Sequence, residues 1–340
     1  MRSEALAHLG GLWAHDLQEV ARDPSAVESG GRWAVVIPYA GPPIFARFAR
    51  WVSEAPRRSP GGWSCGDRWS TSLDEHAYTS GVRRIQDHIA AGDVYQVNLC
   101  RVLATEAHGD IRALHEGLMG ENPAPHQGLV SIPELGLDVV TASPELFLRR
   151  RGANLSTSPI KGTASSRELL QDKDVPENIM IVDLMRNDLA RVAVTGSIRV
   201  PELLRVEQHP GLVHLVSDVT CEVGDEVTWE QILSATFPPG SVTGAPKSSA
   251  LRIIDECEPV SREVYCGAIG WIDTDRREAE LAVAIRTFWI RDGVLRFGTG
   301  AGITWGSDPH GEWHETELKA RRLCTVASES RTRRTLAATS

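Results

Sequence analysis

The sequence lacks any long apolar run, and this bears on where the protein resides. No segment reaches the roughly 20 consecutive apolar residues that a membrane-spanning helix needs. The N-terminal stretch MRSEALAHLGGLWAHDLQEV carries Glu4, His8, His15 and Asp16 where a secretory signal would be apolar. We therefore expect a protein that stays in the cytoplasm.

Closely spaced cysteine pairs are also missing. The cysteines are scattered along the chain, at Cys65, Cys100, Cys221, Cys257, Cys266 and Cys324. Without a Cys-x-x-Cys pair or a regular spacing, neither a zinc site nor a disulfide framework is indicated. Reduced thiols are the expected state.

An excess of basic residues is absent as well. The formal net charge is −9, which argues against a general affinity for nucleic acid or for an anionic membrane surface. Hydrophobic residues make up 41% and charged residues 24% of the 340 residues, the balance of an ordinary globular protein with one large domain or two smaller ones. A site for an anionic small molecule must therefore be built locally.

Hydrophobic periodicity predicts a mixed α/β protein with large, mostly antiparallel sheets. Helices are predicted at 74–92, 111–119, 175–192, 229–237, 248–257 and 310–329. Strands are predicted at 94–103, 128–133, 137–144, 145–152, 212–223, 266–273, 280–290 and 294–305. The three consecutive strands within 128–152 suggest an antiparallel meander.

Three regions of different character follow from this pattern. Residues 1–73 contain short strand and loop signals without a motif, and we expect them to pack on the core. Residues 74–327 form the main domain, and the tail at 328–340 is polar.

Two predicted helices begin with paired carboxylates. Asp174 and Glu177 open one helix, and Glu312 and Glu315 open another. Positions i and i+3 share a helix face, so facing pairs would form a site for a hard cation such as Mg²⁺. Acidic residues in a first turn also complement the helix dipole, and this alternative stays open.

Cationic residues occur in unusual settings. Lys161 stands between an apolar Pro-Ile pair and a Gly-Thr turn in PIKGT. Arg286 lies late in an apolar strand, where it is either paired with a carboxylate of the protein or available for one on a ligand. Lys319 follows Glu315 by one helical turn, which fits an anion contact or an exposed salt bridge equally well.

Glycine and buried polar residues give weaker signals. GTGAG, at 298–302, lacks the spacing of a dinucleotide or phosphate loop, so a tight turn is expected there. His214 and Glu145 are polar residues within apolar strands, where a satisfied core histidine and a strand-end glutamate are the ordinary explanations.

Taken together and in order, these motifs resemble those of the chorismate-utilising enzymes. The matching segments are YQVNL, SPELFL, PIKGT, ENIMIVDLMRNDL, PPGSVTGAPK, AIRT and GAGI…SDPHGEWHET, which run from about Asp74 to Ala327. The resemblance implies an α+β fold, a four-layer α/β/β/α sandwich with two large sheets and the active site in a cleft between them.

The resemblance also implies a metal and a substrate. Glu177 and Glu315 would be the principal Mg²⁺ ligands, with Asp174 and Glu312 in the same acidic cluster, and the metal would hold the ring carboxylate of chorismate. The implied contacts to the remainder of the substrate are Arg286 and Tyr265 at the enolpyruvyl carboxylate, with Lys319, Gly300, Ala301 and Gly302 nearby, and Thr163 and Gln96.

Lys161 decides between activities within the family. Members resembling PIKGT aminate chorismate at C4, with the lysine amine attacking C2, whereas members resembling PIAGT aminate C2. Glu145 would then be the general acid for the departing C4 hydroxyl, and His214 would lie beside that hydroxyl. A lysine that only contacts the substrate remains the alternative.

Gln96 and the absence of an amidotransferase motif add two expectations. Members that add water to C2 resemble a lysine base at the position of Gln96, and a neutral amide cannot serve as that base. No Cys-His-Glu series of a glutaminase is found in the sequence, so ammonia should come from a separate glutaminase subunit or from solution. Amination at C2 and a non-catalytic chorismate-binding protein remain open.

Overall fold

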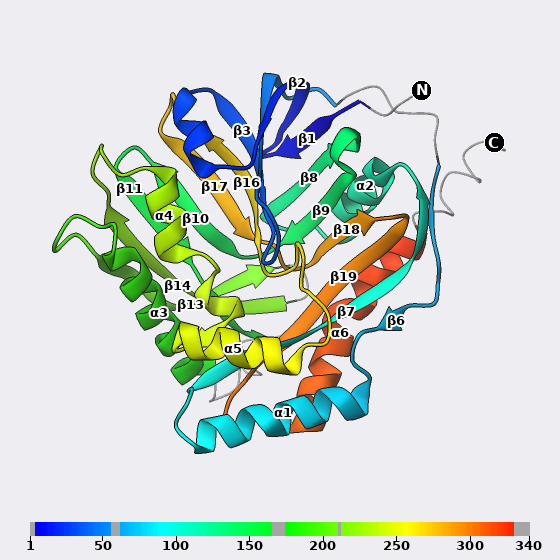
Figure 1. The fold of residues 1–340 in the computed structure, drawn as a ribbon, viewed down its shortest axis with the longest axis vertical. Helices are drawn as coiled ribbons and strands as arrows, with labels where there is room; N and C mark the ends of the chain where they lie inside the picture. Colours follow the sequence, from blue (N-terminus) through cyan, green and yellow to red (C-terminus); the bar gives the residue numbers. More distant parts are fainter. Residues whose placement is uncertain (1–3, 56–61, 165–173, 210–211, 330–340) are drawn as a thin grey trace.

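The computed structural model describes residues 4–55, 62–164, 174–209 and 212–329. Its helices are α1 (Glu75–Ala90), α2 (Ile111–Glu121), α3 (Asp174–Ala190), α4 (Trp229–Thr236), α5 (Lys247–Cys257) and α6 (Pro309–Glu329) (Figure 1). Its strands are β1 (Leu6–Leu9), β2 (Leu12–Ala21), β3 (Arg32–Ile37), β4 (Ile44–Val52), β5 (Trp63–Cys65), β6 (Ser70–Thr71), β7 (Gln96–Gly109), β8 (His126–Ile132), β9 (Leu137–Ser143), β10 (Leu146–Arg151), β11 (Asn154–Ser158), β12 (Ile160–Ala164), β13 (Arg199–His209), β14 (Leu212–Glu222), β15 (Gly244–Ala245), β16 (Ala268–Asp273), β17 (Glu278–Val283), β18 (Thr287–Arg291) and β19 (Val294–Ile303).

The strands pair antiparallel in two arms. The first arm runs from β1 through β8, β9, β18 and β19 to β7. The second runs from β2 through β4, β3, β16, β17, β10 and β11 to β14, which also pairs with β12 and β13. Because β1 pairs with β2 as well as β8, the two arms are hydrogen-bonded to each other. The predicted α+β class with antiparallel sheets is confirmed.

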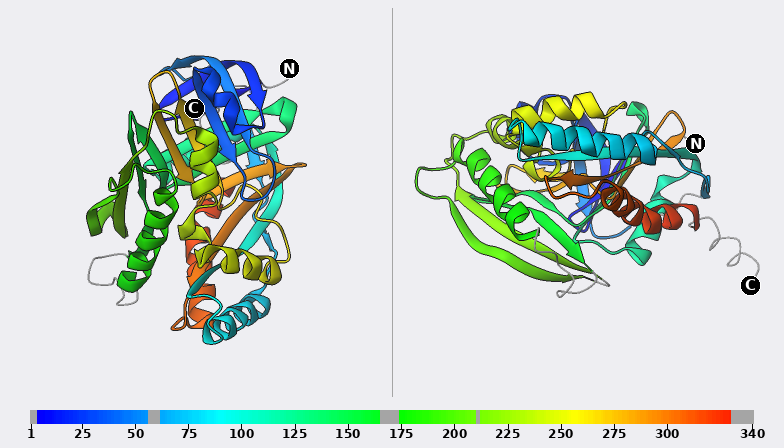
Figure 2. Two further views of the ribbon diagram at one scale, coloured as in Figure 1. Left: turned by 60° about the vertical axis from the view of Figure 1, so that its left-hand side comes forward. Right: turned by 90° about the horizontal axis from the view of Figure 1, so that it is seen from below.

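Helices cover the two arms with separate apolar clusters. In the first arm, α2 and α6 pack over β9, β18 and β19, while α1 and α5 pack on β7. In the second, α3 lies along β12 and β14 and contacts α4 (Figure 2). The largest cluster joins strands of both arms with α3 and α4. Burial of these apolar faces supplies the main driving force for folding.

Helix starts follow the chemistry of the chain. Asp74 caps α1 by accepting a hydrogen bond from the N–H of Ala77, and Thr228 with Gln231 forms a capping box on α4. Among the described residues, no helix is both long and apolar enough to cross a membrane.

Two strand predictions were wrong. The meander stops after β9, because β9 pairs with β8 and β18 whereas β10 pairs with β11 and β17. The chain therefore passes from one arm to the other at Pro144 and Glu145. Pro144 has no N–H for a ladder, and Ser143 uses its hydroxyl to bond the carbonyl of Val283 at 2.6 Å.

The predicted strand 280–290 is two strands, β17 and β18, which belong to different arms. Arg286 lies between them with φ +50°, a region that non-glycine residues seldom occupy. Apolar composition continues on both sides because both strands are buried, so the pattern gave no sign of the break.

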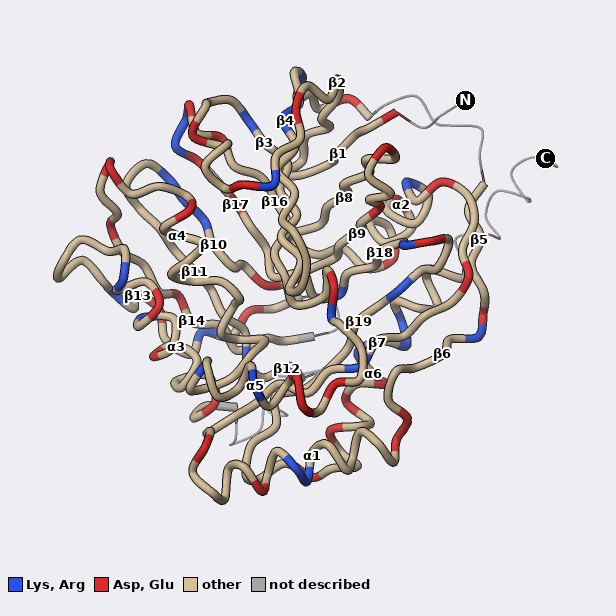
Figure 3. Tube along the Cα trace, viewed as in Figure 1, with Lys and Arg blue, Asp and Glu red and all other residues tan. Residues whose placement is uncertain are grey.

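The expected turn at GTGAG was also wrong, since these residues lie inside β19. Charged residues of both signs are spread over the whole fold (Figure 3).

Candidate active site

Glu145 lies where the chain crosses between the arms, and only 4% of it is exposed. Its backbone is fixed on both sides, since its N–H donates to the Ser143 hydroxyl at 3.2 Å and its carbonyl accepts from the N–H of Val283 at 3.0 Å. Burial raises the pKa of Glu145 to about 7, although a hydrogen bond from Ser241 and the charge of Lys161 oppose the rise. A carboxyl group with this pKa can deliver a proton near neutral pH.

Lys161 projects from an irregularity in β12. The register of β12 against β14 shifts between Ile160 and Thr163, and Gly162 adopts φ +82°. Such a bulge re-aims a side chain out of the regular ladder, which explains the glycine in PIKGT. Burial lowers the pKa of Lys161, so a larger fraction of the amine is neutral than in water.

The charges around Lys161 come from several elements. The pKa of Lys161 responds to Glu177 of α3, Glu145, and both Lys319 and Glu315 of α6. The structure thus brings five of the predicted residues into one electrostatic neighbourhood, although they are far apart in the sequence.

His214 and Thr163 occupy paired positions on β14 and β12. His214 is 1% exposed, so it is buried next to the bulge that carries Lys161. The side chain of Thr163 lies outside the described residues.

Three alternate glycines of β19, the strand that pairs with β7, leave one face of β19 without side chains at these positions. Residues 298, 300 and 302 point the same way, because side chains alternate along a strand. A β-carbon on Gly298 would lie 2.0 Å from the Tyr265 ring, and one on Gly300 would lie 2.6 Å from the sulfur of Cys100. Glycine is therefore needed here for close approach of other groups.

Gly302 marks the point where both arms meet at the site. A β-carbon placed on it would lie 3.0 Å from Lys161 Nζ, 2.2 Å from Gln96 Nε2 and 3.1 Å from Asn98 Oδ1. Three polar groups therefore surround one small volume above Gly302.

Tyr265, whose ring lies against Gly298, and Arg286 are the predicted contacts to a substrate carboxylate. Tyr265 is 5% exposed, and burial raises the pKa of its phenol, which stays a neutral donor. Arg286 is half-buried, and burial lowers its pKa. Within the described residues, the Arg286 guanidinium has no ion-pair partner. Arg286 was expected to pair either with a carboxylate of the protein or with one on a ligand. The lack of an ion-pair partner among the described residues favours the ligand.

Lys319 is anchored rather than free. Its Nζ donates to the carbonyl of Gly300 at 2.9 Å and pairs with Glu315 at 2.6 Å. Ala301 is buried between the two glycines. The i, i+4 salt bridge is therefore present, and it also holds the amine against the glycine face.

Carboxylates of α3 and α6 lie near enough to Lys161 to influence its charge. Glu177 and Glu315 both act on Lys161, whereas Glu312 is 3% exposed and accepts a hydrogen bond from Ser307 at 2.7 Å. The side chain of Asp174 lies outside the described residues, among which no three acidic, histidine or cysteine side chains converge on one point. Two carboxylates near Lys161 are compatible with Mg²⁺, which seldom takes an all-protein cage and usually keeps waters and substrate oxygens as ligands.

Two residues of this region were missed in the sequence. Ser241, in PPGSVTGAPK, bonds to Glu145, and no local pattern links these distant segments. Asn98 lies two residues after Gln96 on β7 and so on the same face; that spacing could have identified it.

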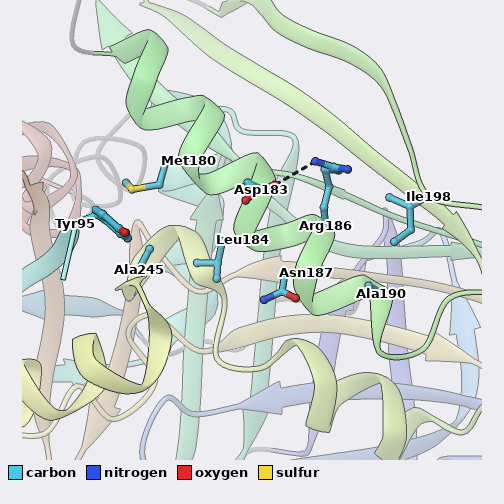
Figure 4. Close-up of a pocket in the computed structure, with 9 residues that line it drawn as sticks. All are labelled: Tyr95, Met180, Asp183, Leu184, Arg186, Asn187, Ala190, Ile198 and Ala245. Atoms are coloured by element: carbon cyan, nitrogen blue, oxygen red, sulfur yellow. Dashed lines mark hydrogen bonds and ion pairs between the residues drawn. The ribbon is translucent and has the colours of Figure 1, made fainter. Parts of the chain in front are cut away.

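A pocket of about 450 Å³ lies alongside α3 but contains none of the predicted residues. Met180 and Leu184 of α3 face Tyr95 and Ala245 across it (Figure 4). Its charged groups, Asp183 and Arg186, pair with each other at 3.1 Å. This pocket is therefore separate from the predicted residues around Lys161.

Residues 44–325 match the family model of the chorismate binding enzymes. The chain belongs to this family. The chain is 37% identical to aminodeoxychorismate synthase component 1 of Salmonella typhimurium, and the match covers 82% of this chain and 63% of the relative. Its counterpart in Streptomyces lividans is 32% identical over 94% of this chain and 75% of the relative.

Other relatives carry different activities in their names. Anthranilate synthase component 1 of Streptomyces coelicolor is 38% identical, over 76% of this chain and 52% of the relative. The chain thus spans between 52% and 75% of the length of these three curated relatives.

Solved structures confirm the family fold. A putative 2,3-dihydroxybenzoate-specific isochorismate synthase of Bacillus anthracis superposes with a TM-score of 0.81 at 22% identity, covering 95% of this chain and 96% of that one. Anthranilate synthase component I of Streptococcus pneumoniae gives a TM-score of 0.74 at 24% identity, covering 87% and 80%. At such identities the likeness concerns the fold alone.

Proposed function

We propose that this chorismate binding enzyme is an aminodeoxychorismate synthase component I. It would use ammonia to replace the C4 hydroxyl of chorismate, giving 4-amino-4-deoxychorismate for p-aminobenzoate formation. The observation that carries the proposal is the position of Lys161. Its Nζ lies next to Gly302, near the amide of Gln96. By the family resemblance, Gln96 stands where water-adding members have a lysine base, so the neighbouring amine of Lys161 would lie close to C2. Two of the relatives above bear the same name.

The chain's own residues can supply each proton and bond of the first step. The neutral Lys161 amine donates its lone pair to C2, both ring double bonds shift by one position, to C1=C6 and C4=C5, and the C4–O bond breaks. Glu145 gives its proton to the departing hydroxyl, which leaves as water, and the buried His214 would lie beside that hydroxyl. Ammonia then adds at C4 as the Lys161 amine is expelled from C2.

Binding groups surround this centre. Arg286 and Tyr265 would hold the enolpyruvyl carboxylate, with Lys319, Thr163 and the Gly300–Gly302 backbone close by. Arg286 is suited to this role because a guanidinium binds a carboxylate with two parallel hydrogen bonds.

Glu177 and Glu315 would hold Mg²⁺, with Asp174 and Glu312 in the surrounding acidic cluster. When bound, the metal supplies positive charge that neutralises the ring carboxylate of chorismate.

The ammonia source is expected to be a separate glutaminase subunit. The relatives are named as a first component, which supports a second one, and free ammonia in solution would serve in its absence.

Product analysis tests the proposal. The purified chain is incubated with chorismate, Mg²⁺ and ammonium at mildly alkaline pH, and the products are identified by NMR. An amine at C4 with the enolpyruvyl group retained is expected. Anthranilate or an amine at C2 would instead support the activity of the Streptomyces coelicolor relative, and unreacted chorismate would support a non-catalytic binding protein.

Substitution of the lysine separates nucleophile from contact. Lys161→Ala should abolish amination at C4 while chorismate still binds, and Lys161→Arg should do the same because a guanidinium remains protonated. Unchanged C4 amination in either variant would overturn the nucleophile assignment.

A further inference from the structure

Two carboxamides in the site have unusual surroundings. Gln96 is 0% exposed and Asn98 is 8% exposed. Both amide atoms of Gln96 and the Oδ1 of Asn98 form no hydrogen bond with any residue that the structure describes. Leaving a buried polar atom without a partner is energetically unfavourable. Such groups in a native structure require an explanation, and a role at a reaction centre is one of those known.

A third carboxamide nearby shows the normal case. Asn178, next to Glu177 on α3, is also fully buried. Its Nδ2 donates to the carbonyl of Leu215 at 3.1 Å, and its Oδ1 accepts from the Ser217 hydroxyl at 2.5 Å. The contrast shows that this fold can satisfy an interior amide where the amide serves only the structure.

The amide groups of Gln96 and Asn98 lie near the amine of Lys161, because all three approach the same point above Gly302. Gln96 and Asn98 share one face of β7, opposite Gly302, whose missing β-carbon leaves room for Lys161 Nζ. The backbone of Asn98 is rigidly held, since its N–H donates to the carbonyl of Thr243 at 2.7 Å and its own carbonyl accepts from Arg262 at 2.9 Å. A half-turn of the terminal torsion lets either amide present its oxygen.

We propose that Asn98, together with Gln96, positions Lys161 as the nucleophile. This inference rests on the proposed function. A neutral primary amine has two N–H bonds and one lone pair, so two amide oxygens that accept both N–H bonds leave the lone pair directed at the substrate. When the lone pair forms the bond to C2, the nitrogen becomes positive and its N–H groups become stronger donors. The two oxygens therefore bind the developing ammonium better than the starting amine, which is what lowers a barrier.

Asn98→Leu removes the acceptor and keeps a similar side-chain volume. We expect the rate of C4 amination to fall by about 100-fold, the scale of a misplaced reacting group, with chorismate affinity within about twofold of the parent (fluorescence titration without ammonium). Asn98→Asp retains an oxygen at the same place and should keep more of the rate than Asn98→Leu above pH 8, where more of the amine is neutral.

Stability provides the matched control. Loss of an unsatisfied amide should leave the melting temperature of Asn98→Leu unchanged or higher, whereas Asn178→Leu should melt earlier because it leaves Ser217 and Leu215 without partners. If leucine is too large for the site, Asn98→Ala serves as a second variant that also removes the amide.

The outcomes separate this inference from the proposed function. If the parent chain aminates C2, the function itself fails whatever Asn98 does. If the parent aminates C4 and the Asn98 variants keep the full rate, the positioning role is overturned. Equal losses of rate and of chorismate affinity would make Asn98 a substrate contact and would also overturn it.

Discussion

At the scale of single residues, Glu145 carries the clearest electrostatic signature. Burial raises its pKa to about 7, so its acid form declines above that pH. As the general acid it must be protonated, and kcat/KM for C4 amination should therefore fall as the pH rises through about 7. In Glu145→Gln the rate should be lower by about 100-fold or more, and it should no longer fall as the pH rises through 7. A rate profile from pH 6 to 9 measures both effects. If the rate of Glu145→Gln still falls as the pH rises, the titrating group is not Glu145.

The same pKa predicts a cost in stability. A carboxyl group whose folded pKa is raised from 4.5 to about 7 contributes stability below pH 4.5 that is lost as the pH rises to 7. The loss is about 3 kcal/mol, at 1.36 kcal/mol per pKa unit. Glu145→Gln should thus be more stable than the parent at pH 8 and similar at pH 4. Urea unfolding at the two pH values tests this, and equal stability at pH 8 would contradict the raised pKa.

At the scale of elements, the first hairpin docks through a pair of histidines. His8 of β1 and His115 of α2 are joined by a hydrogen bond of 2.7 Å, and Trp13 of β2 stacks on His8. Burial lowers the pKa of His115 to about 3, helped by the charge of His8. The unfolded chain takes up this proton below about pH 6.5, so stability is lost as the pH falls from 6.5 toward 3.

His115→Gln should reduce this acid sensitivity. Between pH 7 and 4.5 the parent should lose about 3 kcal/mol more than the variant, following the two-unit interval over which only the unfolded form is protonated. Urea unfolding at both pH values measures the difference. His310→Gln, on the exposed side of α6, serves as the control and should behave like the parent.

The break between β17 and β18 gives a further prediction at this scale. Arg286 has φ +50°, which costs a non-glycine residue about 1 kcal/mol or more. Arg286→Gly should therefore melt no earlier than the parent and yet lose chorismate affinity by at least tenfold. Calorimetric titration and a thermal melt on the same sample separate the two effects. Undiminished affinity would show that Arg286 does not bind the substrate.

How far the sequence predicts this molecule differs between its elements. The helices α1, α3 and α6 were predicted nearly to their ends, because apolar periodicity and caps such as Asp74 are local signals. The crossing at Glu145 and the break at Arg286 were not predicted, since strand pairing depends on partners far away in the chain. Sequence motifs identified Lys161, Glu145 and Gln96 as candidate site residues. The contact of Ser241 with Glu145 could be recognised only in the folded structure.

At the scale of the whole molecule, the site is divided between the two arms. Lys161 and Glu177 come from β12 and α3 on the second arm, whereas Gly302 and Glu315 come from β19 and α6 on the first. A ligand that bridges Glu177 and Glu315 therefore links the arms. Any ligand that binds only the folded protein stabilises it, by about 2.7 kcal/mol at a concentration 100 times its Kd.

Magnesium and chorismate should accordingly stabilise the protein together. In a Lys161→Ala background, which prevents turnover, Mg²⁺ with chorismate should raise the melting temperature by about 2 °C or more for a chain of this size, and EDTA should remove the metal-dependent part. Glu177→Gln and Glu315→Gln should each lose this part, because one carboxylate alone leaves the bridge incomplete. Asp183→Asn, an exposed position on the same helix α3, should keep the full shift. A magnesium titration that is unaltered in both glutamine variants would place the cation elsewhere, and the two glutamates would then serve only to tune the charge around Lys161.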